Sequence, residues 1–84
     1  MPVISSFYGI RIYMYIDHRP PHFHVYYDGF SGKVSIESGE IEGDLPPKAK
    51  HLVKEWLEMH KDKLLQNWER LNKGEQIVKI KPLI

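Results

Sequence analysis

Apolar and polar side chains alternate along three segments in the first half of the chain. Over residues 9–17, isoleucine and methionine occupy the even positions, while polar or aromatic residues occupy the odd ones. The same period of two recurs over residues 22–27 and residues 33–37. Because the side chains of a strand point alternately to its two faces, the pattern predicts three strands, each with one buried face. Short connections predict that they form an antiparallel meander.

Proline and glycine set the bounds of these strands. Pro20 and Pro21 end the first strand, because a proline has no N–H to donate to a ladder. The second and third strands are separated by a predicted turn over residues 28–32, which contain two glycines. Residues 3–8 are also β-prone, and we expect Gly9 to interrupt this stretch with a bulge or a bend.

The apolar period changes to that of a helix over residues 47–73, with lysine and glutamate between the apolar positions. Pro47 suits the first turn of a helix, and Gly74 is a natural end. One helix of roughly 26 residues would be ~39 Å long, which is long for so small a domain. We therefore expect a break near residues 60–62, and whether there are one or two helices stays open. Residues 76–81 predict a last short strand.

These elements predict one α+β domain over residues 1–84. Its expected architecture is a three-stranded antiparallel meander over about residues 3–41, extended by a fourth strand if the C-terminal segment pairs, with one face covered by one or two C-terminal helices. The chain has 42% hydrophobic and 27% charged residues, which is ordinary for a globular domain with one modest core.

Composition narrows the function classes. The chain has no cysteine, so disulfides, thiolate metal sites and thiol nucleophiles are excluded. A signal peptide and a membrane-spanning apolar stretch are not found, and we expect a cytoplasmic protein without a membrane partner. The formal net charge is only +1, so binding to a nucleic acid would need a local patch of cations.

The sheet face opposite the helices carries the candidate chemistry. Alternation places tyrosines, histidines and cations on it, whereas a face that serves solubility alone would carry more lysine, glutamate and threonine. This prediction depends on the register, because a slip of one residue exchanges the two faces. The predicted face consists of Arg11, Tyr13, Tyr15, His22, His24, Tyr26, Lys33, Ser35 and Glu37.

Two histidines on this face are candidates for acid–base catalysis. His22 and His24 lie two positions apart on one strand, so their side chains project side by side about 6.5–7 Å apart. Imidazole titrates near neutrality, so a pair can act as base and acid in cleaving an RNA phosphodiester. Tyr26 is the third candidate, as a phosphate-positioning group or weak proton donor. Arg11 or Arg19 would stabilise the developing phosphorane charge.

The same face predicts a nucleic-acid interface. Tyr13 and Tyr15 can stack on unpaired bases, which is typical of single-strand recognition. Arg11, Arg19 and Lys33 are the candidate phosphate contacts. Cross-strand aromatic packing is the structural alternative for the tyrosines.

Three other interpretations of these side chains stay open. His22 and His24 could chelate a divalent metal with His18 as a third ligand. A face rich in tyrosine and arginine is also typical of an interface with a partner protein or with a second copy of the chain. The simplest interpretation is that the imidazoles are surface groups hydrogen-bonded to neighbouring tyrosine hydroxyls or carboxylates. No cofactor is expected.

Several segments together resemble one bacterial family. They are Ile-Ser-Ser-Phe-Tyr-Gly-Ile at residues 4–10, Pro-Pro-His-Phe-His-Val-Tyr-Tyr at residues 20–27, Leu45-Pro46, and a helix with Trp56, His60 and Leu-Leu-Gln-Asn-Trp at residues 64–68. The chain is similar over essentially its whole length to domain-of-unknown-function family 4160.

The resemblance implies a small bacterial or archaeal protein, encoded beside another small protein in the manner of a toxin–antitoxin or regulatory module. It supplies no catalytic residues, and the positions that match its signature are His22, Phe23, His24 and Tyr26. Architecture alone is also similar to small RNA-binding toxins with a histidine on a strand. We therefore expect an RNA-binding module, and cleavage of the RNA as the toxin of a pair stays open. A non-enzymatic partner-binding or dimerisation module is the alternative, and a metal-binding histidine cluster is the second.

Overall fold

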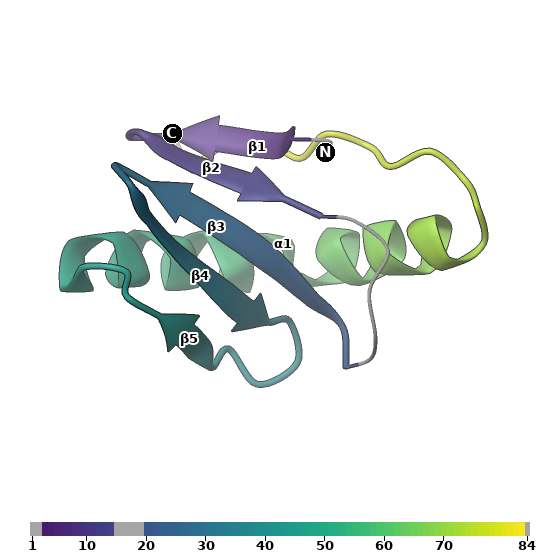
Figure 1. The fold of residues 1–84 in the computed structure, drawn as a ribbon. Coiled ribbons are helices and arrows are strands. Elements are labelled where there is room, and N and C mark those ends of the chain that lie inside the picture. The colour runs from purple at the N-terminus through teal and green to yellow at the C-terminus, as the bar shows by residue number, and fades with distance from the viewer. Residues whose placement is uncertain (1–2, 15–19, 84) are drawn as a thin grey trace.

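The computed structural model describes residues 3–14 and 20–83. One antiparallel sheet lies in front of a single long helix (Figure 1), and the strands follow one another across the sheet in chain order. The elements are β1 (Val3–Phe7), β2 (Ile10–Tyr13), β3 (His22–Tyr27), β4 (Phe30–Ser35), β5 (Ile41–Gly43) and α1 (Pro47–Asn72). The α+β class and the antiparallel meander are confirmed, but the sheet has five strands where the sequence predicted three, or four with the C-terminal segment.

Two-residue turns account for one of the additional strands. Tyr8 and Gly9 join β1 to β2, and Asp28 and Gly29 join β3 to β4. All four residues have positive φ, between 47° and 82°, which is the geometry of the type I′ hairpin turn. Gly9 therefore closes a hairpin instead of bending one strand. For the same reason β4 begins at Phe30, three residues before the predicted start.

The fifth strand, β5, forms the sheet edge next to β4. In the sequence, Ile41 was the only sign that this polar connection could contain a strand. Ile41 pairs with Val34 of β4, and β5 ends after three residues. At the opposite edge, residues 76–81 do not form the predicted strand. The backbone N–H of Ile80 donates to the carbonyl oxygen of Ile4 at 2.8 Å, so the tail follows β1 without a ladder.

The core lies between α1 and the sheet face that packs against it, which we call the inner face. Trp56 is fully buried there, with its ring centroid 5.5 Å from that of Phe7 and 5.7 Å from that of Phe23. The predicted alternation is confirmed by the buried apolar positions of the predicted strands. They are Ile10, Ile12, Met14, Phe23, Val25, Val34 and Ile36.

The helical layer is one helix with a break. His60 has φ −127° and ψ 21° inside α1, so the helix is interrupted where the sequence predicted. Its ring is buried, with the centroid 5.6 Å from that of Trp56. In the described part of the chain, no helix combines the length and the apolar character needed to cross a membrane.

Candidate nucleic-acid interface

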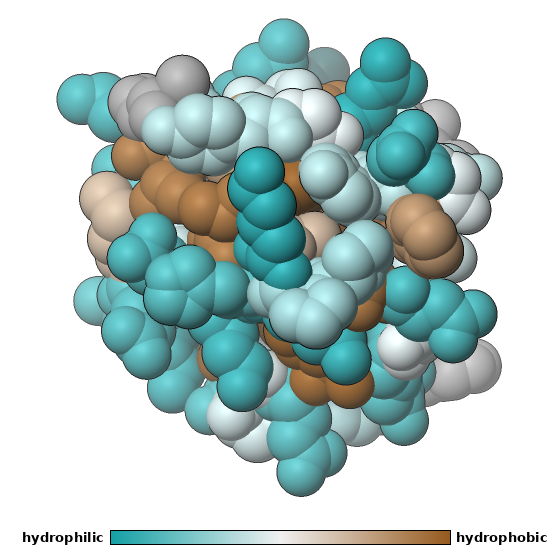
Figure 2. All heavy atoms as spheres, turned by 90° about the vertical axis from the view of Figure 1, so that its left-hand side faces the viewer, coloured by the Kyte–Doolittle hydropathy of each residue, from teal (hydrophilic) through white to brown (hydrophobic). Residues whose placement is uncertain are grey.

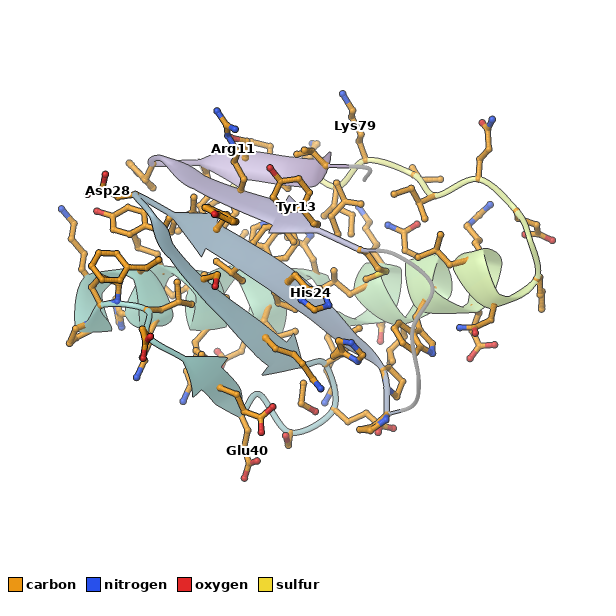
Figure 3. All side chains as sticks on the ribbon, viewed as in Figure 1. Arg11, Tyr13, His24, Asp28, Glu40 and Lys79 are labelled. Carbon is orange, nitrogen blue, oxygen red and sulfur yellow. The ribbon has the colours of Figure 1, made fainter. Side chains whose placement is uncertain are left out.

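Strand register brings the predicted side chains into rows across the sheet face turned away from α1, which we call the outer face. Tyr13 pairs with His24, His24 with Lys33, and Lys33 with Glu42, so one row crosses four strands. Figure 3 shows Tyr13 and His24 side by side on this face, with Arg11 farther along β2. The outer face consists of Arg11, Tyr13, His24, Tyr26, Ser31, Lys33 and Glu42.

A second row runs beside the first. Arg11 pairs with Tyr26 of β3, and Tyr26 pairs with Ser31 of β4. Tyr26 is 52% exposed, and Arg11 is also exposed. The two rows therefore place an exposed aromatic ring next to a cation, as predicted from the alternation.

The rows border a hollow of about 510 Å³ on the outer face. Tyr13, His24, Tyr26, Lys33 and Glu42 are among its lining residues, and Tyr13 and His24 are half-buried in it. The Lys33 ammonium lies 4.0 Å from the Glu42 carboxylate, and both side chains are exposed. An exposed pair at this distance contributes little free energy, so Lys33 can exchange this partner for a ligand anion.

Close approach of β4 and β5 positions Glu42 beside Lys33. Gly43 pairs with Gly32, and a Cβ on Gly43 would lie 2.5 Å from the carbonyl oxygen of Ser31. Gly43 also has φ 121°, which side chains rarely adopt. Glycine at position 43 therefore allows the contact that fixes the β5 wall of the hollow.

The outer face is electrically asymmetric. A second hollow of about 320 Å³ shares Lys33 and Glu42 with the first, and Glu40 also lines it. Figure 3 shows Glu40 at the edge of the molecule beside β5 and Arg11 at the opposite edge. An anionic chain crossing the face is therefore favoured near β2 and disfavoured near β5.

His22 does not lie where the sequence placed it. Only 3% of the residue is exposed. Its Nδ1 lies 2.8 Å from the carbonyl oxygen of Pro20, and its ring centroid lies 5.1 Å from that of Trp68 on α1. His22 therefore packs against α1, and it also lines the second hollow together with Lys33 and Glu42. The prediction that the His22 ring faces solvent is therefore wrong.

The two imidazoles are nevertheless neighbours. Their ring centroids are 5.2 Å apart, closer than the spacing estimated from an ideal strand, and the rings are edge-on at 73°. Of the two, His24 lines the large hollow. The catalytic roles assigned to His22, His24 and Tyr26 stay predictions.

Three predicted site residues lie outside the described residues: Tyr15, His18 and Arg19. The predicted metal site would have used His18 as its third ligand. Among residues 3–14 and 20–83, no group of three or more histidine, aspartate or glutamate side chains is placed to hold a metal ion.

Sequence reasoning missed two residues of the site, Ser31 and Glu42. The Asp28-Gly29 dipeptide carried the signal for Ser31, because a two-residue turn at that position places Ser31 opposite Tyr26. For Glu42 the sequence held only a weak signal, since β5 is three residues long and lies within a polar connection.

The comparison with curated proteins found no match, and neither did the comparison with solved structures. A family model described as "Domain of unknown function (DUF4160)" matches residues 9–69, which is well over half of the chain. These residues include β2 to β5, all of the outer face and most of α1. The chain therefore belongs to the DUF4160 family.

Proposed function

We propose that the protein binds single-stranded RNA on the outer face. The observation that carries this proposal is the hollow lined by Tyr13, His24 and Tyr26. Lys33 also lines it, and Arg11 pairs with Tyr26 on the neighbouring strand. Unpaired bases stack on aromatic side chains, and the backbone between them needs cations at its phosphates. A duplex would instead present its bases already paired and stacked, so these rings favour a single strand.

His24 lies at the centre of the interface, between Tyr13 and Lys33 in the row. The Nε2 atom of His24 is buried, so the imidazole meets a ligand only where it lines the hollow, where it can stack against a base. The burial of His22 supports binding over cleavage, because acid–base cleavage needs two groups that reach the scissile phosphate. We therefore expect bound RNA to stay intact.

The alternative is a partner-binding or dimerisation module that uses the same tyrosines and arginine. This alternative predicts that the assembled protein does not bind RNA, because burial of the outer face in a protein interface would exclude it. Light scattering on the purified chain at micromolar concentration separates the two. A dimer that dissociates when RNA is added would favour competition for one face, whereas a dimer indifferent to RNA would place its interface elsewhere.

The test is fluorescence anisotropy with a labelled single-stranded RNA at low salt. Tyr26→Thr removes an exposed ring while keeping a residue that suits a strand. Loss of one stacked base costs about 1–3 kcal/mol, so the affinity should fall about 5- to 150-fold. His24→Ala should weaken binding in the same assay, and a denaturing gel should show intact RNA throughout.

Tyr8→Asn is the matched control. Tyr8 is 55% exposed and lies in the β1–β2 turn, away from the hollow, with φ 49°. Asparagine tolerates that conformation, so the variant removes an exposed tyrosine without straining the turn. If Tyr8→Asn weakens binding as much as Tyr26→Thr does, the outer face is not the RNA site.

A further inference from the structure

The tail after α1 is fastened along the helix by side chains. The amide of Asn67 donates to the carbonyl oxygen of Val78 at 2.7 Å and accepts from the Val78 N–H at 2.9 Å. The Trp56 indole donates to the carbonyl oxygen of Lys81 at 2.8 Å. Together with the bond from Ile80 to Ile4, these contacts hold the tail between α1 and β1.

This arrangement gathers cations from the helix and from the tail. Lys63, Arg70 and Lys79 all line a hollow of about 170 Å³ between the second half of α1 and the tail. Lys81 follows two residues after Lys79 in the tail, and both residues are exposed. We call these four residues, Lys63, Arg70, Lys79 and Lys81, the helix–tail seam.

The four seam cations form no ion pair with another described residue. Among residues 3–14 and 20–83, the ion pairs found are Lys33 with Glu42 and His51 with Glu55, and neither involves the seam. Arg70 also lines a neighbouring hollow with Glu69, Glu75 and Lys73, so two carboxylates and one further cation lie next to one end of the seam. The local charge is therefore positive in a chain whose formal net charge is +1.

Two of these cations also affect the pKa of buried His60. Burial lowers its pKa from the ordinary value, and Lys63 and then Lys81 lower it further through their positive charge. One lysine comes from the helix and one from the tail, so their charges act on one place from both sides.

We propose that a single strand of RNA leaving the outer face crosses β1 and continues along the helix–tail seam, where the four cations contact its phosphates. Figure 3 shows Arg11 and Lys79 extending beyond the same edge of the molecule. A strand that passes over this edge would therefore meet Arg11 on the outer face and then Lys79 on the tail. Glu40 and Glu42 lie toward the other edge of the sheet and disfavour the opposite path. This inference rests on the proposed function for the first part of the path.

The consequence is a dependence on RNA length and on salt. An oligonucleotide of about six nucleotides is short enough to remain on the outer face, since comparable single-strand folds bind about 4–16 nucleotides. One of about 20 nucleotides also reaches the seam. Each phosphate contact in a single strand adds about 0.7 to the slope of log affinity against log salt.

The test compares two double variants that remove equal charge. Lys63→Gln with Lys79→Gln removes two seam cations, whereas Lys48→Gln with Lys54→Gln removes two exposed lysines from the first half of α1. With the 20-mer, the seam variant should show a salt slope shallower by about 1.4 and weaker binding at low salt. Its affinity for the 6-mer should match that of the control variant.

The outcomes separate the seam proposal from the proposed function of the outer face. If both double variants lose equal affinity for the 20-mer, the effect is one of net charge and the seam proposal fails, while Tyr26→Thr still tests the outer face. If the seam variant loses slope but Tyr26→Thr binds both RNAs as the unchanged protein does, the seam stands and the outer-face function falls. Absence of binding to either RNA at low salt overturns both.

Discussion

The two faces of one sheet differ in what their side chains do. On the inner face, Trp56 packs against the rings of Phe7 and Phe23 and is fully buried. On the outer face, Tyr26 is half exposed beside the row from Tyr13 to Glu42. Because the same strands supply both faces, substitutions should separate stability from ligand binding according to the side on which they lie.

Trp56→Ala should have the largest effect on stability. Removing a buried tryptophan costs about 3–5 kcal/mol, which is a large part of the 5–15 kcal/mol that stabilises a typical domain. The variant also loses the hydrogen bond to the Lys81 carbonyl oxygen. Chemical denaturation should place its midpoint far below that of the unchanged chain. Trp56→Phe retains much of the packing and should be intermediate, and equal midpoints for all three proteins would contradict this core.

Asn67→Ala should have the next largest effect, at about 1–3 kcal/mol, because it removes two part-buried hydrogen bonds to the Val78 backbone, each of which contributes about 0.5–1.5 kcal/mol. Hydrogen exchange should show the loss concentrated in the tail, at the amides of Val78 and Ile80. Asn72→Ala is the control, since the Asn72 amide donates to the Trp68 carbonyl oxygen one turn earlier in the helix and not to the tail residues 76–83. Equal tail protection in the two variants would mean that Asn67 does not fasten the tail.

His60 should make stability depend on pH. Its folded-state pKa lies below the ordinary value of 6.5, chiefly through burial. Below pH 6.5 the unfolded chain therefore binds the proton more readily than the folded chain, and stability falls as the pH falls toward the folded pKa. Denaturation midpoints measured between pH 7.5 and about pH 5 should decline, and His60→Gln should flatten that decline.

His51→Gln provides the comparison, because His51 is an exposed helix residue beside Glu55. It should leave the decline nearly as steep as in the unchanged chain. A decline that His51→Gln removes and His60→Gln preserves would assign the pH dependence to the surface instead of the helix break.

Tyr26→Thr should have the smallest effect on stability, within about 0.5 kcal/mol, because an exposed outer-face ring loses little packing. The same substitution carries the largest expected loss of RNA affinity on that face. Measuring both quantities on one preparation sharpens the comparison between faces. A large drop in the denaturation midpoint would show that the ring supports the fold and would make its binding result uninformative.

The fold was predictable wherever a local period determines burial. Alternation identified Ile10, Ile12 and Met14 as inner-face residues, and the helical period identified Trp56. The break at His60 was also predicted, from helix length alone. The predicted strand bounds were wrong at the turns. The sequence-based prediction treated Asp28-Gly29 as part of a longer connection and so delayed the start of β4.

The candidate site was predictable only in part. Arg11, Tyr13, His24, Tyr26 and Lys33 all reach the outer face as expected. Glu42 joins them only because β5 pairs with β4, and that pairing depends on the close contact at Gly43. The helix–tail seam was missed because its lysines are sparse in the sequence and come together only when Asn67 and Trp56 fasten the tail.

The sequence by itself determined which side chains share a face, because the direction of each side chain along a strand follows from covalent geometry. Tertiary structure alone decided which of them reach solvent. His22 and His24 have the same direction by parity and each lines a hollow, yet His22 is buried against Trp68 whereas His24 is half-buried. Accessibility depends on which side chains pack against each ring, and Trp68, which contacts His22, comes from a distant part of the chain.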